Sequence, residues 1–532
     1  MGRVRAVIAV ALAVALGGCG SDDGSAGGGG DPLSYLPADA GSVVVVDTDL
    51  GGAPAKALED AMRAHPLEGK GFEEQLRGLA SDLGLPWEDL EPLLGNDLIV
   101  GTPGLGLLSR ASRSGEDLAI VGAIEVEDEG KLRELLEGPL NFKKIGEESG
   151  ADLYAEEENE ASVAIENGTL VFADRRETLA QALRTHDGPA TQRFSRRDLG
   201  RATTGLPGDA PITLYANLAR VTGQPDLRGM RKVKWVDALR TGAVTIGGRD
   251  GAVVADAQAT TDPAGLTDAD LPFAPGTPAT AVPTRPDTVN SGSANQSQTT
   301  TFLLDLLRAW RPTGRFAQDV ATVERQRGID FDEEVLRQFD GPSSSALSAD
   351  GSFGARSAVR DPKRMERTLR KIAPDVPRLA QDLDPLRKEG LALLLLFAPD
   401  APVGTSVLGE SDVTVERVDG ERALYRISDL AAQVEGPEET TAEVPDEIVF
   451  GLLGDAFVVA SDVPRARAAA RRRTAPVPGV RGAGVMRARG QGPLRPLVQR
   501  VLGFDPGPRA DLTGSIDATR ARVRATARVR MP

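Results

Sequence analysis

Few residues in this sequence are of types that carry out chemistry. The chain of 532 residues has one cysteine, Cys19, and two histidines, His65 and His186. It therefore forms no internal disulfide, and a zinc site built from Cys and His is nearly excluded. Only His65 or His186 could supply the base of a Ser-His pair. His65 precedes a proline at the end of a predicted helix and His186 lies in a polar stretch typical of a turn, so we expect both at the surface.

The 78 Asp and Glu residues are the remaining candidates. A glycosidase needs two carboxylates about 5 to 10 Å apart in different environments, and nothing in the sequence marks such a pair. Two dense acidic runs, 146–160 and 435–447, could bind calcium but lack the spacing of an EF-hand, so we expect solvated acidic loops there.

Motifs that bind nucleotides or activate a serine do not occur. The chain has no G-x-x-x-x-G-K-[ST] phosphate loop and no G-x-S-x-G nucleophile elbow. The glycine-rich stretch 101–109 lacks the third glycine that a dinucleotide site needs for close helix packing. We therefore expect no catalytic residue, no bound metal and no cofactor, and we interpret the protein as a non-enzyme.

The first nineteen residues give the clearest signal. Two arginines precede an apolar run over 6–16, which is typical of a secretory signal peptide and about half as long as a membrane-spanning helix. The stretch 16–19, LGGC, resembles the lipobox of bacterial lipoproteins, with Gly17 in place of the commoner Ala or Ser. In that family a diacylglycerol is attached to the cysteine sulfur and the chain is cut before the cysteine. The alternative is an ordinary signal peptide with an incidental cysteine.

The resemblance implies a mature chain that begins at Cys19 and is held in the membrane by acyl chains such as palmitate, on the extracytoplasmic face. Two acyl chains are enough for stable anchoring. Residues 1–18 would be the signal peptide. Residues 19–32 are rich in Gly, Ser and Asp, which predicts a flexible tether between the lipid and a folded body.

The body has the pattern of an internal duplication. Five segments recur in the same order in the two halves: 72–88 with 316–332, 122–138 with 356–372, 150–154 with 420–425, 167–183 with 454–470, and 239–260 with 511–529. Each half alternates strands and helices and ends in a predicted hairpin. We therefore expect the α+β class, with two tandem units of mainly antiparallel strands and helices over 33–265 and 266–532.

Particular residues mark the expected elements. Asp128 and Asp361 are expected to cap helices, and Asp174 and Asp462 each follow an apolar strand and precede a helix. The polar stretch 281–300 predicts a loop. The net insertion of the second half is expected mostly within 375–412, whose apolar stretch 391–397 is too short to cross a bilayer.

The net charge of −16 repels nucleic acid and anionic head groups at long range. Charge is unevenly spread, because sixteen arginines face three aspartates from residue 465 onward. Aromatic residues that could stack on bases are almost absent there, so we expect no nucleic-acid partner. Along 519–530 the arginines at 520, 522, 524, 528 and 530 share one face of a predicted strand, where we expect solvation or pairing with acids.

The start of the body, 34–50, reads SYLPADAGSVVVVDTDL. It resembles the opening of an uncharacterised family of exported bacterial proteins, domain of unknown function 3352, which often follows a lipobox or a membrane anchor. The resemblance implies the location and no activity, cofactor or catalytic residue.

Together these observations predict a membrane-anchored lipoprotein of the cell envelope, lipidated at Cys19, that acts as a non-enzymatic binding or scaffolding module. Its partners would be the membrane and an envelope protein, glycan or lipid. Two alternatives stay open: a carrier of a lipid or other apolar ligand, and a carboxylate-dependent hydrolase of envelope glycans.

Overall fold

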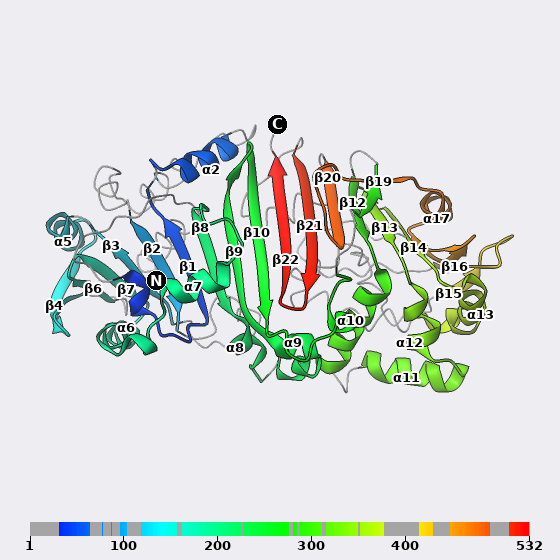
Figure 1. Ribbon diagram of the computed structural model, residues 1–532, viewed down its shortest axis with the longest axis horizontal. Helices are drawn as coiled ribbons and strands as arrows, with labels where there is room; N and C mark the ends of the chain where they lie inside the picture. The colour runs from blue at the N-terminus through cyan, green and yellow to red at the C-terminus, as the bar shows by residue number, and fades with distance from the viewer. Residues whose placement is uncertain are drawn as a thin grey trace. The chain divides into compact units, whose positions relative to one another are not determined.

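The computed structural model describes two compact units. The described residues are 31–49, 51–63, 77, 87, 96–103, 119–126, 128–156, 162–225, 227–275, 280–284, 288–310, 315–348, 350, 352–376, 414–428, 447–489 and 510–530. Unit 1 comprises the described residues up to Val221 together with Leu239–Thr260. Unit 2 comprises Thr222–Ala238 and Thr261–Val529. Both units combine helices with antiparallel strands, which confirms the predicted α+β class (Figure 1).

Unit 1 is built on an antiparallel sheet. Its strands are β1 (Ser42–Asp47), β2 (Asp97–Thr102), β3 (Val121–Glu125), β4 (Phe142–Glu148), β5 (Ala151–Glu156), β6 (Ser162–Glu166), β7 (Thr169–Ala173), β8 (Ile212–Asn217), β9 (Leu239–Arg249) and β10 (Ala252–Thr261). Their order across the sheet is β4-β5-β6-β7-β3-β2-β1-β8-β9-β10. The helices of the unit are η1 (Pro32–Tyr35), α2 (Ala53–Arg63), α5 (Glu129–Glu137), α6 (Arg176–Asp187), η4 (Ala190–Gln192), α7 (Arg196–Thr203) and α8 (Leu218–Thr222).

Strand β1 lies in the middle of this sheet and is buried on both faces. Val44 and Val46 pack into the cluster that contains the apolar side of α5, whereas Val43 and Val45 pack into the cluster that contains α6. A strand covered on both faces is apolar at every position rather than at alternate ones. This explains the run of four valines.

Unit 2 contains a second series of antiparallel strands. Its strands are β12 (Thr288–Ser293), β13 (Ser343–Ser348), β14 (Phe353–Ala358), β15 (Thr414–Arg417), β16 (Ala423–Ser428), β17 (Ile448–Leu453), β18 (Ala456–Ala460), β20 (Gly484–Arg489), β21 (Asp511–Thr519) and β22 (Arg522–Arg530). Their order is β15-β16-β17-β18-β14-β13-β12-β20-β21-β22. A separate pair consists of β11 (Ala281–Pro283) and β19 (Thr474–Pro476).

The helices of unit 2 cover both faces of its sheet. They are η5 (Arg228–Lys232), α9 (Lys234–Ala238), η6 (Asp268–Asp270), α10 (Gln296–Trp310), α11 (Arg315–Arg327), α12 (Phe331–Glu334), η7 (Leu336–Gln338), α13 (Pro362–Ile372), η8 (Ala373–Asp375) and α17 (Val463–Ala470). The apolar side of α13 packs with Tyr425 and Phe450, and that of α17 packs with Leu424 and Val449. Neighbouring residues on one strand point to opposite faces, so these two helices lie on opposite sides of β16 and β17.

The loop predicted over 281–300 is wrong, because this stretch contains β11, β12 and the start of α10. Strand β12, TVNSGS, is central and buried although most of its side chains are polar. Ser291 Oγ lies 2.6 Å from Ser345 Oγ of β13, which satisfies both hydroxyls. Small side chains are required there because a Cβ atom on Gly292 would lie 2.5 Å from the carbonyl oxygen of Ala281.

The predicted helix caps are confirmed at both aspartates. Asp128 accepts a hydrogen bond from the backbone N–H of Lys131 at 2.9 Å, and Asp361 accepts one from Arg364 at 2.9 Å. Each bond satisfies an amide that the helix leaves free in its first turn.

Asp174 and Asp462 differ in role. Asp462 caps α17 by accepting from the N–H of Arg465 at 2.6 Å, whereas Asp174 accepts from the N–H of Ile120 at 3.1 Å and extends the pairing of β3 with β7. The residue at the cap position of α6 is Arg175, which makes no side-chain cap. Both aspartates thus lie between a strand and a helix as predicted, but only Asp462 caps its helix.

Strand β4 is the edge strand of its sheet, since among the described strands it pairs with β5 alone. Its register shifts between Lys144 and Gly146, which is a β-bulge, and Ile145 within the bulge is 44% exposed.

None of the described helices is both long and apolar enough to cross a bilayer.

Candidate functional site

The predicted lipidation site, Cys19, lies outside the described residues, as do His65, the predicted signal peptide and most of the predicted tether and insertion. The described chain starts at Asp31, whose carboxylate accepts from the N–H of Leu33 at 3.2 Å and caps η1. Leu33 and Tyr35 are almost fully buried. The body is thus fixed from its first described turn.

Four side chains hold η1 against the rest of unit 1, and we call them the N-terminal clamp: Ser34, Tyr35, Glu166 and His186. The hydroxyl of Tyr35 donates to Glu166 Oε2 at 2.7 Å in a buried setting. The rings of Tyr35 and His186 stack with centroids 4.2 Å apart and planes 9° apart. Burial, followed by the hydrogen bond to Glu166, raises the pKa of Tyr35 well above its usual range. The phenol is therefore a permanent donor to the buried carboxylate.

The prediction that His186 lies in a surface turn is wrong. It lies in the last turn of α6, partly buried against Tyr35. A stacking partner that is 151 residues away in sequence leaves no local pattern, so the polar residues around His186 pointed to a turn.

The clamp brings a serine and a histidine together, but in a structural arrangement. Ser34 Oγ lies 2.6 Å from His186 Nδ1, and it also donates to the carbonyl oxygen of Asp31 at 2.5 Å. A hydroxyl that donates its single hydrogen to a carbonyl accepts from the imidazole. A nucleophilic serine needs the opposite polarity, with the imidazole taking the hydroxyl proton. Ser34 and His186 therefore fasten η1.

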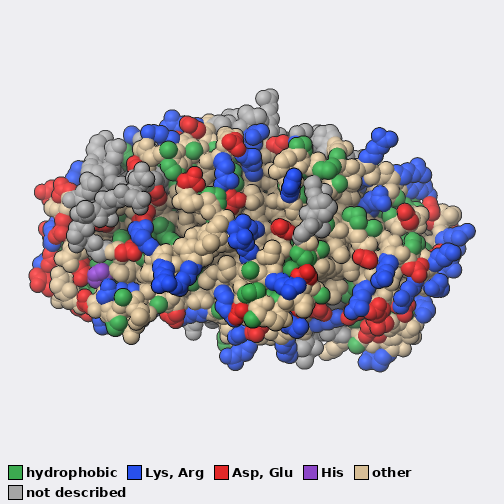
Figure 2. Space-filling view, viewed as in Figure 1, with side chains coloured by type: hydrophobic (Ala, Val, Ile, Leu, Met, Phe, Trp, Pro, Cys, Tyr) green, Lys and Arg blue, Asp and Glu red, His purple; other side chains and the backbone are tan. Residues whose placement is uncertain are grey.

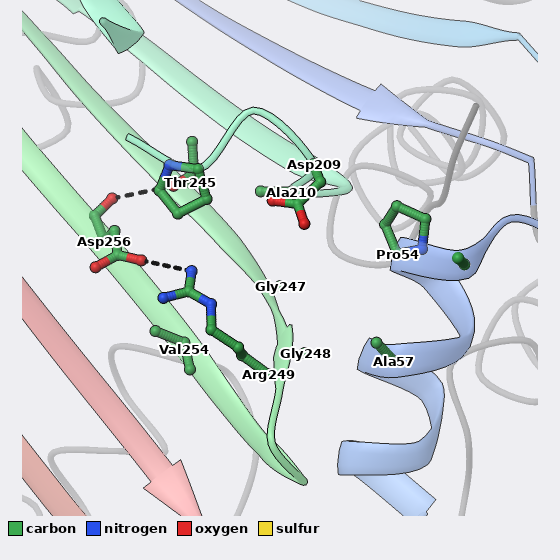
Figure 3. Close-up of a pocket in the computed structure, with 12 residues that line it drawn as sticks. Pro54, Ala57, Asp209, Ala210, Thr245, Gly247, Gly248, Arg249, Val254 and Asp256 are labelled. Carbon is green, nitrogen blue, oxygen red and sulfur yellow. Dashed lines mark hydrogen bonds and ion pairs between the residues drawn. The ribbon is translucent and has the colours of Figure 1, made fainter. Parts of the chain in front are cut away.

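A pocket of about 350 Å³ lies in unit 1 between the start of α2 and the β9–β10 hairpin (Figure 3). Arg249 donates to Asp256 at 3.0 Å on one wall, and Thr245 lies beside the backbone of Asp256. Asp209 lies on the wall formed by the loop before β8. Helix α2 packs closely on the hairpin, because a Cβ atom on Gly248 would lie 2.0 Å from the carbonyl oxygen of Ala57.

A second pocket, of about 440 Å³, lies in unit 2 between α9 and α10. Its charged residues are largely paired: Lys234 with Asp270 at 3.3 Å and Arg308 with Asp305 at 3.5 Å. Burial raises the pKa of Asp305, although Arg308 acts in the opposite direction. Both pockets carry charged side chains, so their chemistry suits small polar ligands better than acyl chains.

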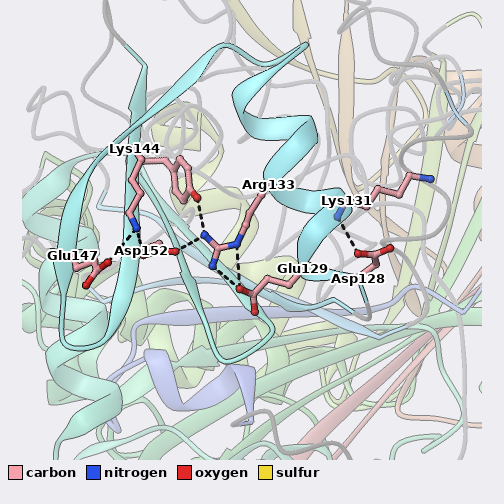
Figure 4. A network of polar contacts seen from close by, with 8 residues as sticks. Asp128, Glu129, Lys131, Arg133, Lys144, Glu147 and Asp152 are labelled. Atoms are coloured by element: carbon pink, nitrogen blue, oxygen red, sulfur yellow. Dashed lines mark hydrogen bonds and ion pairs between the residues drawn. The ribbon is translucent and has the colours of Figure 1, made fainter.

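The acidic run 146–160 is a hairpin in its described part rather than a loop, because 146–148 belong to β4 and 151–156 to β5. Its carboxylates pair with cations (Figure 4). Arg133 of α5 contacts Glu129 and Asp152 and donates to Tyr154 Oη at 2.9 Å, and Lys144 lies 2.6 Å from Asp152. These contacts raise the pKa of Arg133, and the hydrogen bonds from Lys144 and Arg133 lower the pKa of Asp152. The network joins α5 to β4 and β5.

Within the described ranges no group of three His, Cys, Asp or Glu residues could hold a metal ion. The stretch 435–446 of the second acidic run lies outside those ranges. At the C-terminal strand the predicted alternation is confirmed: Val523 and Val529 of β22 are buried, and the arginines at even positions from 522 to 530 lie on the other face. Arg520 lies in the turn before the strand and pairs with Asp268 at 2.8 Å.

Comparison with known proteins gives few relatives. The chain matches no family model and no curated protein. Six solved chains are similar to it, among them crystal forms IV, III and I of TP0453. Each of these three is 10% identical, with TM-scores of 0.27, 0.27 and 0.26. The likeness covers 43%, 45% and 45% of this chain, and 80%, 83% and 82% of theirs.

Proposed function

We propose that this protein is a membrane-anchored extracytoplasmic lipoprotein, held by a diacylglycerol on Cys19. The observation that carries the proposal is the position of the single cysteine, directly after an apolar run of signal-peptide length. The described body supports it, because η1, which starts thirteen residues beyond Cys19, is fastened by the N-terminal clamp. A folded body whose first turn is held by buried contacts can follow a flexible tether directly.

The body acts as a non-enzymatic binding or scaffolding module, with an envelope protein, glycan or lipid as partner. The support is chemical. In the one Ser-His contact of the described chain, the Ser34 hydroxyl donates to the carbonyl oxygen of Asp31 rather than to His186. Asp152 and Asp256 are each paired with a cation. An activated acid or nucleophile needs a different environment.

The two units arose by duplication of one α+β unit, with the boundary near 265. The strand orders support this, because β1 to β10 and β12 to β22 correspond one to one when β19 is left out. The registers agree as well: Val45 lies opposite Ile99, and Ser291 lies opposite Ser345 at the equivalent positions. In each unit one helix follows the third strand and covers one face, while another follows the seventh and covers the other.

The anchor is tested by fractionating cells that express the wild type or Cys19→Ser. We expect the wild type in the membrane fraction, carrying metabolically labelled palmitate, and the variant without label and no longer retained by lipid. A matched control, Cys19→Ser with Ser21→Cys, keeps one thiol two residues past the cut site and should also stay unlabelled. Full retention of Cys19→Ser in the membrane contradicts the proposal.

The duplication is tested by cross-strand cysteine pairs in a Cys19→Ser background. Val45→Cys with Ile99→Cys, and Ser291→Cys with Ser345→Cys, should both form disulfides on mild oxidation, because the paired positions lie directly opposite. The controls shift the second cysteine by one residue, to Val100 or Ala346. If a shifted pair cross-links preferentially in one unit and not in the other, the two units do not share a strand register, and this support for the duplication is lost.

A further inference from the structure

Helix α13 has the most strongly two-sided sequence among the described helices. Met365, Leu369 and Ile372 are buried against the sheet of unit 2. The residues on its outer side and just before it are exposed and cationic: Arg360, Lys363, Arg367, Arg370 and Lys371. We call this set, without Arg370, the α13 basic face. Figure 2 shows Lys and Arg side chains projecting from the part of unit 2 where Figure 1 draws α13.

The acids beside α13 already have partners. Glu366 pairs with Arg370 at 2.5 Å, Asp375 pairs with Arg327 at 2.7 Å, and Glu334 accepts from Thr368 at 3.0 Å. Asp361 is occupied as the helix cap. The α13 basic face is therefore left without a carboxylate partner among the described residues.

The basic surface continues onto β15. Arg417 lies directly opposite Tyr425 in the β15–β16 pair, and Tyr425 packs against α13. Directly opposed residues point to the same face of a sheet, so Arg417 lies on the side covered by α13. Burial raises the pKa of Tyr425, while the nearby Arg370 and Arg417 act in the opposite direction, which places both cations close to this ring.

The opposite face of the same strands is different. There α17 also carries arginines, but Arg465 contacts Asp462 and lies 3.5 Å from Asp350, and Arg467 lies 3.2 Å from Glu421. Local pairing thus neutralises Arg465 and Arg467, whereas the α13 basic face has no such pairing among the described residues.

We propose that the α13 basic face docks on the anionic phospholipid head groups of the membrane that holds Cys19. The choice of membrane rests on the proposed anchor. The overall charge of −16 does not oppose docking at close range, because fields are screened beyond about 8 Å at physiological salt. A row of cations on a rigid helix meets phosphate groups without ordering a loop, so little entropy is lost. Unit 2 would then lie on the bilayer rather than extend away from it.

The test is vesicle flotation of the chain from residue 19 onward with Cys19→Ser, which keeps every described residue and carries no lipid. We expect binding to vesicles of phosphatidylcholine with 30% phosphatidylglycerol, weak binding to phosphatidylcholine alone, and loss of binding at 0.5 M salt. Neutralisation by Lys363→Gln, Arg367→Gln and Lys371→Gln should weaken binding roughly 100-fold, given the typical contribution of each cation near an anionic surface. Charge reversal of the same three residues to Glu should weaken binding further.

The matched control reverses three exposed cations of unit 1, Lys56, Arg176 and Arg197, and changes the net charge by the same amount. It should leave binding within about twofold of the parent, because these residues lie outside the α13 basic face. Equal loss in both triple variants, or equal binding to neutral vesicles, overturns the proposal. So does retention on an acidic polysaccharide without vesicle binding, which would assign the face to a glycan. Because the tested chain has no lipid, the result is independent of whether Cys19 is acylated.

Discussion

Helices α5 and α13 follow the third strand of their sheets and begin with the same aspartate cap, yet they present opposite charges. Helix α5 carries Lys131 and Arg133 against Glu129, Glu134 and Glu137, whereas α13 carries Lys363, Arg364, Arg367, Arg370 and Lys371 against Glu366. The central strands differ as well, because β1 is apolar and β12 is polar. The difference teaches that one topology tolerates two kinds of core and two kinds of surface.

The largest effects on stability should come from exchanging apolar and polar residue types between the central strands β1 and β12. Val45→Ser in β1 removes apolar contacts and buries a hydroxyl, and Ser291→Val in β12 removes the hydrogen bond between Ser291 and Ser345 while adding volume. Each should lower the free energy of unfolding of its unit by about 3 kcal/mol. Hydrogen exchange of peptides from each unit separates the two effects.

A double variant sharpens this prediction. Ser291→Val with Ser345→Val removes both hydroxyls and should recover part of the loss, because neither end of this hydrogen bond is then kept without the other. A stabilising effect of Ser291→Val alone would mean that β12 does not depend on its polar pairing.

The N-terminal clamp belongs to unit 1 alone, so breaking it should lower the stability of unit 1 and leave that of unit 2 unchanged. Tyr35→Phe takes the donor from buried Glu166 and should cost about 2 kcal/mol at pH 7. Because burial raises the pKa of Tyr35, the folded state keeps a proton that the unfolded state loses above about pH 10, and stability falls by about 1.4 kcal/mol per pH unit there. Tyr35→Phe should flatten this fall in unit 1 peptides. An unchanged alkaline slope contradicts the assignment.

The two tyrosines beneath α5 and α13 should respond differently to loss of their hydroxyls. Tyr154 is fully buried and accepts from Arg133 at 2.9 Å, so Tyr154→Phe should cost about 1.5 kcal/mol. Tyr425→Phe should cost less than about 0.5 kcal/mol, because the described chain gives its hydroxyl no hydrogen bond. Urea titration followed by hydrogen exchange gives both values. Equal costs would mean that the link from Arg133 to Tyr154 does not stabilise α5.

The smallest effect should be the same in both units. Asp128→Ala and Asp361→Ala each remove one cap bond of 2.9 Å, and each should cost about 1 kcal/mol in spite of the opposite helix charges. Asp128→Asn and Asp361→Asn keep the acceptor and serve as controls. A large difference between the two alanine variants would show that helix charge matters more than the cap.

Local sequence signals predicted much of this fold. The aspartate caps and the terminal hairpins depend on residues a few positions apart, and those predictions are confirmed. Strand β12 was missed because hydrophobic periodicity fails for a buried strand whose serines satisfy one another across the sheet.

The N-terminal clamp was missed for a different reason. Tyr35 and Glu166 are 131 residues apart, and no spacing rule connects them. Polar stretches that surround a long-range contact look like turns, as His186 does. The predicted lipidation of Cys19 stays a prediction.

The β-bulge in β4 has a consequence for contacts between copies of this chain, and it would matter most under the proposed anchor. Proteins held by lipid at a surface are concentrated in two dimensions, and an open sheet edge then invites one copy to add its strand to another and form fibres. The register shift between Lys144 and Gly146 twists this edge, and charged side chains lie along the strand, so an incoming strand meets misaligned amides and charged groups. The bulge thereby disfavours the addition of a strand from another copy at this edge of unit 1.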